Sequence, residues 1–151
     1  MGGAAAATAI AFSGVHEGLS LTPYWDAIGH VTTYCYGETD KSKLKAEFTI
    51  AECDDKLSEG LLLRYQAMLR CSPEVAALSA GEKAAYLDLA YNAGIGAYCN
   101  HSIPKLLRAH RRVAACQRLK EYSFSRGTWV QGLFDRRQDA TELCMKDIPT
   151  Q

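Results

Sequence analysis

Residues 16–37 read HEGLSLTPYWDAIGHVTTYCYG, a stretch that predicts the end of a helix followed by a tight β-hairpin. Gly18 is placed to stop a short helix over residues 13–18, which puts Glu17 in its last turn. From Val31 to Tyr36 the residues alternate between two faces, a period of two that is typical of a hairpin strand. On that alternation we expect Thr32 to face the same space as Asp26.

Two carboxylates and a hydroxyl are spaced along this stretch, at Glu17, Asp26 and Thr32. Cleavage of a sugar–sugar bond uses two carboxyl groups, one on each side of the bond that breaks. A helix end and a hairpin would place Glu17 across a cleft from the other two residues. Each residue also has a purely structural alternative. Glu17 could be a surface charge, Asp26 a turn residue and Thr32 a strand residue. The spacing alone is weak, so the hypothesis depends on the motifs that accompany it.

Three motifs in order make the chain similar to a known family, the phage-type lysozymes of glycoside hydrolase family 24, often called endolysins. Residues 17–37 resemble the catalytic motif of that family. Residues 90–96, AYNAGIG, resemble its Asn-x-Gly helix end, and residues 126–137, RGTWVQGLFDRR, resemble its Trp-x-x-Gly-Leu-x-x-Arg-Arg stretch. The likeness therefore covers roughly residues 14–146.

The resemblance implies an α+β fold, mostly α, in which a small β-hairpin lobe is joined by a long helix to a larger helical lobe. It implies an inverting muramidase that hydrolyses the β-1,4 bond between N-acetylmuramic acid and N-acetylglucosamine in peptidoglycan and so lyses the bacterial host. Glu17 would protonate the leaving oxygen, Asp26 would hold or activate a water, and Thr32 would place that water. The enzyme would be made in the infected bacterial cytoplasm and act in the periplasm or on the cell wall. A monomer without metal or cofactor is expected.

Two other functions fit a lysozyme-like scaffold. A lytic transglycosylase uses a single acid and has no need of Asp26 or Thr32, so their presence favours hydrolysis. A non-catalytic module that binds the cell wall or inhibits lysozyme is the second, and the intact set of three residues argues against it.

Residues 1–12 are apolar and carry no charged side chain, and we treat them as a segment apart from a lysozyme domain over residues 13–151. The stretch is shorter than the roughly 20 residues that span a bilayer. Some relatives in the family carry an amino-terminal Gly/Ala-rich signal anchor, and this segment resembles the end of one, with transient membrane association. A frayed or packed leader is the alternative. On the anchor hypothesis, deletion of residues 2–11 leaves lysis of isolated walls unchanged, whereas loss of activity would place the segment in the core.

Charge is unevenly distributed along a chain whose formal net charge is zero. Residues 1–100 carry 7 Lys and Arg against 12 Asp and Glu, whereas residues 101–137 carry 9 against 2. This basic segment is either a binding surface for an anionic partner or a solvated helix surface. Because no nucleic-acid-binding motif accompanies it, no nucleic-acid partner is expected.

Six cysteines are many for a chain of 151 residues and indicate an oxidising compartment. Their wide spacing, without a Cys-x-x-Cys pair, argues against zinc. Six cysteines allow 15 full pairings. The family resemblance implies Cys35 with Cys53 and Cys116 with Cys144, which leaves Cys71 with Cys99.

Capping signals predict the helices of the larger lobe. Thr49 with Glu52 opens a helix over residues 50–70, and Ser79 with Glu82 opens one over residues 80–92. Ser102 is expected to cap the next helix, and two more are expected over residues 112–122 and 133–146. In the last motif, Trp129 is expected to be a core anchor, and Arg136 and Arg137 to form structural ion pairs.

Overall fold

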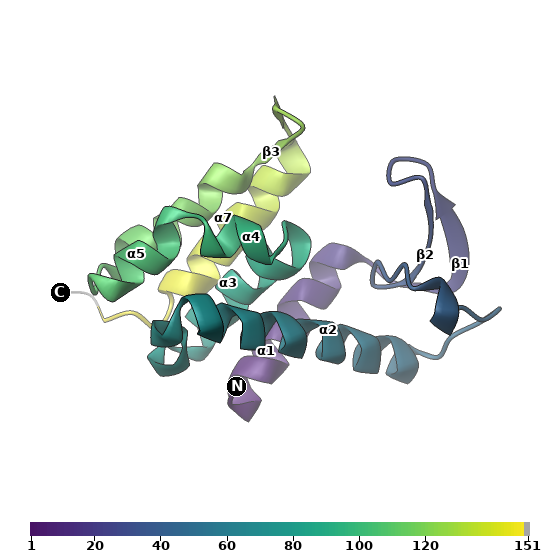
Figure 1. Cartoon of the computed structure of the whole chain (residues 1–151), viewed down its shortest axis with the longest axis horizontal. Helices are drawn as coiled ribbons and strands as arrows, with labels where there is room; N and C mark the ends of the chain where they lie inside the picture. The colour runs from purple at the N-terminus through teal and green to yellow at the C-terminus, as the bar shows by residue number, and fades with distance from the viewer. Residues whose placement is uncertain (150–151) are drawn as a thin grey trace.

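The computed structural model describes residues 1–149 and has two lobes joined by one long helix (Figure 1). Strands β1 (Ser20–Asp26) and β2 (Val31–Cys35) form the smaller lobe, and α2 (Ile50–Cys71) leads from it. The larger lobe contains α1 (Gly3–Glu17), α3 (Ala80–Asn92), α4 (Ile95–Cys99), α5 (Ser102–Arg108), α6 (Arg112–Gln117), the small hairpin β3 (Phe124–Ser125) and β4 (Thr128–Trp129), and α7 (Gln131–Met145). Turns of 3-10 helix lie at Lys41–Lys43, Pro73–Ala77 and Arg118–Tyr122. The predicted α+β, mostly helical class with a small hairpin lobe is confirmed.

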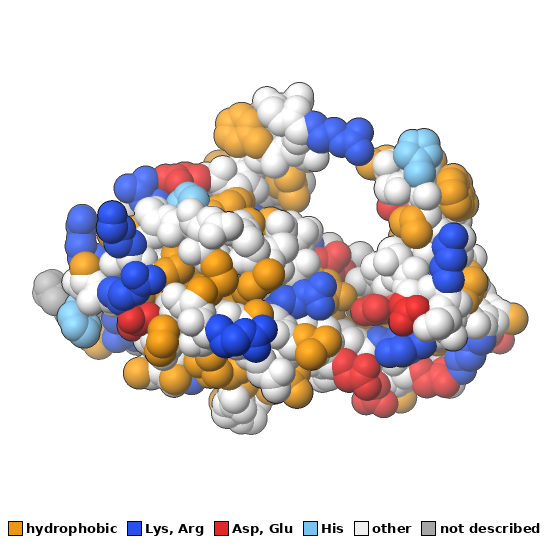
Figure 2. All heavy atoms as spheres, in the orientation of Figure 1, with side chains coloured by type: hydrophobic (Ala, Val, Ile, Leu, Met, Phe, Trp, Pro, Cys, Tyr) orange, Lys and Arg blue, Asp and Glu red, His pale blue; other side chains and the backbone are white. Residues whose placement is uncertain are grey.

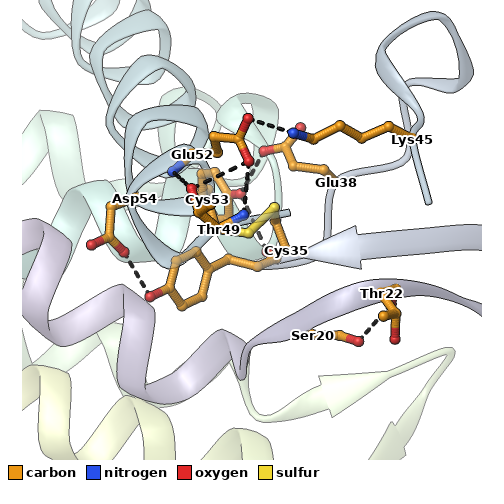
Figure 3. The surroundings of a disulfide bond; sticks show 11 residues. Ser20, Thr22, Cys35, Glu38, Lys45, Thr49, Glu52, Cys53 and Asp54 are labelled. Carbon is orange, nitrogen blue, oxygen red and sulfur yellow. Dashed lines mark hydrogen bonds and ion pairs between the residues drawn. A yellow bond between two sulfur atoms is a disulfide. The ribbon is translucent and has the colours of Figure 1, made fainter. Parts of the chain in front are cut away.

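The linking helix α2 begins where its capping signal predicts. The Thr49 side chain accepts a hydrogen bond from the backbone N–H of Glu52, and the Glu52 carboxylate accepts one from the N–H of Thr49. Lys45 adds a 2.5 Å contact to the same carboxylate, which sits beside the Cys35–Cys53 disulfide (Figure 3). The hydrogen bond from Lys45 lowers the pKa of Glu52 to about 2, with a further contribution from the Thr49 N–H.

A disulfide fixes the hairpin lobe to α2. Cys35 ends β2 and Cys53 lies in the first turn of α2, with their Cα atoms 5.0 Å apart. Beside the bond, the rings of Tyr34 and Phe48 stack at 4.6 Å and form the small core of this lobe. The base of the hairpin is therefore anchored, whereas its turn projects away from α2 (Figure 1).

Helix α3 lies at the centre of the larger lobe, where it packs against α1, α2 and α7. Its capping box at Ser79 and Glu82 is present as predicted. The contact with α7 is close, since a Cβ on Gly81 would lie 2.4 Å from the Leu143 carbonyl oxygen. Apolar side chains from α2, α3 and the later helices complete one core around it. This helix is therefore buried on nearly all sides.

Helix α1 differs from the predicted short helix over residues 13–18, because it begins at Gly3 and runs unbroken to Glu17. One side is buried against the core through Ala5, Ala9 and Ser13, which recur at i, i+4 and i+8. Residues 3–12 therefore belong to the same helix as Glu17 in this structure. Within residues 1–149, no helix combines the length and hydrophobicity needed to cross a membrane.

The other two disulfides fall within the larger lobe. Cys71 at the end of α2 pairs with Cys99 of α4, and Cys116 of α6 pairs with Cys144 of α7. All three pairings match those predicted. Each closes a loop and contributes about 2–4 kcal/mol to stability.

Three local predictions are wrong. Ser102 is the first residue of α5 rather than its cap, and its side chain makes no capping bond. The helix predicted over residues 112–122 is α6 followed by a 3-10 turn. Trp129 lies on the short strand β4 with 47% of its surface exposed, so it is not a core anchor.

About half of the cations of the basic segment pair with carboxylates of the same chain, although Arg108 and Arg118 do so at the surface. Five of its nine cations form ion pairs, namely Arg108, Arg112, Arg118, Arg136 and Arg137. Arg112, for example, donates two hydrogen bonds to the buried Glu82, of 2.8 and 2.5 Å. This use of its charge favours a structural role for much of the segment.

Candidate active site

A cleft of about 460 Å³ opens between the two lobes. Figure 2 shows open space between the β1–β2 hairpin and the helical lobe, with acidic side chains at its base. The cleft is lined by Glu17, Tyr36, Gly37, Glu38, Thr39, Asp40, Lys43, Lys56, Glu59, Gly60, Leu63, Arg64, Tyr91 and Asn92. Polar and charged groups dominate this lining, as suits a polar substrate such as a glycan.

Glu17 is the last residue of α1 and the one predicted site residue that lines this cleft. Gly18 ends the helix with a φ of 73°, a positive value that glycine adopts without strain. Gly37, whose φ is 92°, faces the carboxylate, and a Cβ built on it would lie 3.8 Å from Glu17 Oε2. The Glu17 side chain is 17% exposed, so its carboxyl group is largely sheltered yet open to the cleft.

Arg136 of α7 holds one oxygen of the Glu17 carboxylate. Its Nη2 donates a 2.7 Å hydrogen bond to Glu17 Oε1. The same guanidinium donates to Asp88 through Nε at 2.9 Å and through Nη2 at 2.6 Å. Although burial disfavours its charge, these bonds to Asp88 and the charges of Asp88 and Glu17 raise the pKa of Arg136. Arg136 therefore stays cationic beside Glu17.

Arg137 adds a second cation to the same buried cluster. It donates to Asp88 at 3.3 Å, to the Tyr122 carbonyl at 3.3 Å and to the Asn92 side chain. Burial lowers the pKa of Arg137 to about 10, and neighbouring Arg136 acts in the same direction against the charge of Asp88. The predicted ion pairing of both arginines is confirmed, and Asn92 of the second motif is one of their partners.

Tyr91 forms another part of the cleft wall. Its ring lies against α2 where a Cβ on Gly60 would approach it to 2.9 Å, and the Arg64 guanidinium lies 4.9 Å from the ring centre. Its hydroxyl donates weakly to Glu38 at 3.4 Å. Burial raises the pKa of Tyr91, and the charges of Glu38 and Glu17 raise it further. The phenol stays protonated as a donor in the cleft.

Asp26 ends β1 at the turn of the hairpin and does not line the cleft. Its Oδ1 accepts a 2.9 Å hydrogen bond from the Ile28 N–H, and a Cβ on Gly29 would lie 2.9 Å from Oδ2. The carboxylate thus caps the turn, which is the ordinary role weighed for it above.

Thr32 does not share a ladder position with Asp26. The register pairs Thr32 with Trp25 and pairs Asp26 with Val31. Directly paired residues lie on one face and successive residues on opposite faces. The expected common face of Thr32 and Asp26 is therefore not found in the ladder.

The sequence analysis missed Asp88, the acceptor at the centre of the arginine cluster. Asp88 is fully buried on α3 and also accepts a 2.9 Å hydrogen bond from the Ser13 hydroxyl of α1. The sequence does contain a signal for this residue, namely a single charge within the apolar run AAYLDLAY. A carboxylate buried in such a run requires charged or polar partners.

Comparison with known proteins gives consistent results. The family model "Phage lysozyme" matches residues 14–140. A SAR-endolysin of Enterobacteria phage P21 is 28% identical over 131 residues, which cover 85% of this chain and 77% of the relative. The active form of the phage P1 endolysin Lyz superposes with a TM-score of 0.79 at 20% identity, over 92% of this chain and 83% of that one. An endolysin of Escherichia coli O157:H7 phage FAHEc1 gives 0.78 at 20% identity, over 95% and 94%.

The family model covers most of the chain, including Glu17, the two-lobed core and the paired arginines of α7. The solved structures support the same fold independently, since their similarity extends across both lobes. The protein therefore belongs to the phage lysozyme family and is an endolysin-type enzyme that degrades peptidoglycan.

Proposed function

We propose that the protein is a muramidase that hydrolyses the β-1,4 bond between N-acetylmuramic acid and N-acetylglucosamine. The observation that carries the proposal is a carboxyl group, that of Glu17, presented by a rigid helix end into a polar cleft between two lobes. In this mechanism Glu17 protonates the leaving glycosidic oxygen as general acid. A water then attacks the sugar from the opposite face.

The second half of the mechanism assigns the water to Asp26, assisted by Thr32. Support for this assignment comes from the order and spacing of the three residues in the sequence. In this structure the Asp26 carboxylate caps the hairpin turn instead. An inverting enzyme needs about 6.5–9.5 Å between its two carboxyl groups to admit that water. Asp26 lies at the hairpin turn, which projects away from α2 (Figure 1). The position of this turn therefore sets the distance between the Glu17 and Asp26 carboxyl groups.

The proposal extends to the site of action. The SAR-endolysin relatives support action on the cell wall in the periplasm, with lysis of the host as the outcome. Synthesis in the cytoplasm of the infected cell stays a prediction. A monomeric state, transient membrane association through residues 1–12, and a signal-anchor origin of that segment stay predictions.

The product distinguishes this proposal from its alternatives. We expect digestion of purified peptidoglycan to release fragments that end in reducing N-acetylmuramic acid, with the α-anomer formed first, because water attacks opposite the leaving group. Mass spectrometry and NMR of the first products measure both. Fragments lighter by one water would identify a transglycosylase, an initial β-anomer a retaining enzyme, and absence of fragments a wall-binding module.

Asp26→Asn separates catalysis from turn formation. Asparagine keeps the Oδ1 acceptor for the Ile28 N–H, so the melting temperature should stay within a degree or two, as for substitutions that leave such contacts intact. Loss of the carboxylate should lower the lysis rate roughly 100-fold or more if Asp26 activates the water. Thr32→Ala should have a milder effect. Wild-type lysis by Asp26→Asn would leave Asp26 as a turn residue alone.

A further inference from the structure

The carboxylate of Asp88, on α3, accepts hydrogen bonds from side chains of α1 and α7, although it does not line the cleft. It is fully buried on α3 and accepts hydrogen bonds from Ser13 of α1 and from Arg136 and Arg137 of α7. Burial of a carboxylate is costly unless charged and polar partners satisfy it.

Arg136 connects Asp88 to the cleft. Its Nη2 donates both to Asp88 Oδ1 at 2.6 Å and to Glu17 Oε1 at 2.7 Å, while Nε donates to Asp88 Oδ2 at 2.9 Å. Two bonds to one carboxylate fix the plane of a guanidinium, because its donors form a rigid fork. Asp88 therefore determines where the Arg136 guanidinium can donate its third hydrogen bond, the one to Glu17.

A cation in contact with a general acid poses a difficulty. An acid must hold a proton to donate it, and an adjacent positive charge favours the ionised form. The charged and titratable groups nearest Glu17 are Arg136 and Arg137 of α7, Asp88 and Tyr91 of α3, and Glu38 after β2. The cleft that Glu17 faces is also lined by Lys56, Glu59 and Arg64 of α2 and by Asp40 and Lys43. Asp88 is the anion that both arginines contact, so it offsets the charge that Glu17 would otherwise face.

We propose that Asp88 is a positioning residue for the general acid, acting through Arg136. It holds the guanidinium that places the Glu17 carboxyl in the cleft, and it pairs with the positive charge that Glu17 would otherwise face alone. This inference rests on the proposed function, in which Glu17 is the acid.

The pH profile of lysis tests the charge half of the proposal. Activity of a general acid is lost as pH rises through its ionisation, and an unshared cation moves this loss to lower pH. Asp88→Asn should therefore move the alkaline limb of kcat/KM to lower pH, by less than the roughly one to three pH units of an opposite charge in direct contact, because Asp88 acts through Arg136. At pH values above the midpoint of this fall, activity decreases about tenfold for each pH unit.

Glu82→Gln is a matched control on the same helix. Glu82 is also fully buried and also receives two hydrogen bonds from an arginine, Arg112, but it lies outside the cleft network. The Glu82→Gln variant should lower the midpoint of urea unfolding, as Asp88→Asn does. It should leave the alkaline limb of kcat/KM unchanged. A folded Asp88→Asn variant whose limb coincides with wild type would overturn the charge role.

A double-mutant comparison tests whether Asp88 acts through Arg136. In the Arg136→Gln background, the shift caused by Asp88→Asn should fall to less than half. The double variant removes one charge of each sign, which favours folding. An equal shift in both backgrounds would mean that Asp88 acts on Glu17 directly and would refute the relay.

Asp88→Glu tests the positioning half without loss of charge, and its result stands even if Asp88→Asn does not fold. One added methylene pushes the guanidinium toward the cleft, so kcat should fall roughly tenfold or more with KM little changed, as expected for a misplaced catalytic group. A folded Asp88→Glu variant with wild-type kcat would overturn the proposal. Should Glu17→Gln itself retain full activity, the proposed function fails first, and the two failures are thereby distinguished.

Discussion

Glu17→Gln is expected to lower peptidoglycan hydrolysis by about 100-fold or more, because general acid catalysis typically contributes that much. The substitution keeps the shape of the side chain, and its Oε1 can still accept the 2.7 Å hydrogen bond from Arg136. The amide cannot donate a proton to a leaving oxygen. Folding should therefore persist while the chemistry stops. Loss of turbidity of a cell-wall suspension measures the rate, and circular dichroism measures the fold.

Asp139→Asn serves as the control for Glu17→Gln. Asp139 lies near the same end of α1, 3.5 Å from His16, but its exposed carboxylate faces away from the cleft. This variant should lyse walls at close to the wild-type rate. Equal activity of the two variants would remove Glu17 from the mechanism.

Deletion of residues 2–11 is expected to destabilise the protein severely, contrary to the expectation from sequence alone. It removes the buried Ala5 and Ala9 and leaves six residues of α1, fewer than an isolated helix needs to form. The loss should be at least about 3 kcal/mol, comparable to emptying a large core position. Thermal unfolding should shift to a much lower temperature, and lysis of isolated walls should fall because Glu17 loses its support.

A pair of point substitutions tests the same packing in the intact chain. Ala9→Leu places a larger side chain in the core and should cost about 1–3 kcal/mol. Ala7→Leu makes the same change on the exposed side of the same helix and should be nearly neutral. A truncated protein that melts and lyses as wild type would instead restore residues 1–12 as a separable segment.

Much of the fold could be predicted because its signals are local. The capping boxes at Thr49 and Ser79 fix the starts of α2 and α3 through bonds that span three residues. The length of α1 was missed because its first residues mix glycine with alanine and its Gly2 cap has no side chain, so no local signal marks the start.

The candidate site was predicted less completely, because its contacts are distant in sequence. Glu17 was identified from its motif and lies in the cleft. Its partner Arg136 is 119 residues away, and Asp88 lies 48 residues from Arg136. No periodicity connects residues so far apart. Trp129 was misplaced for a related reason, since the two-residue strands β3 and β4 hold it on the surface.

The three disulfides also determine which parts of the molecule remain joined after a single cut in the backbone. Their loops enclose residues 35–53, 71–99 and 116–144, so a cut within any of these ranges leaves one covalently connected molecule. A cut between residues 19 and 34 would instead produce two separate chains. The smaller would carry the whole of α1 and with it Glu17. The helix that presents the acid is thus connected to the rest of the enzyme by one strand of peptide and by non-covalent packing.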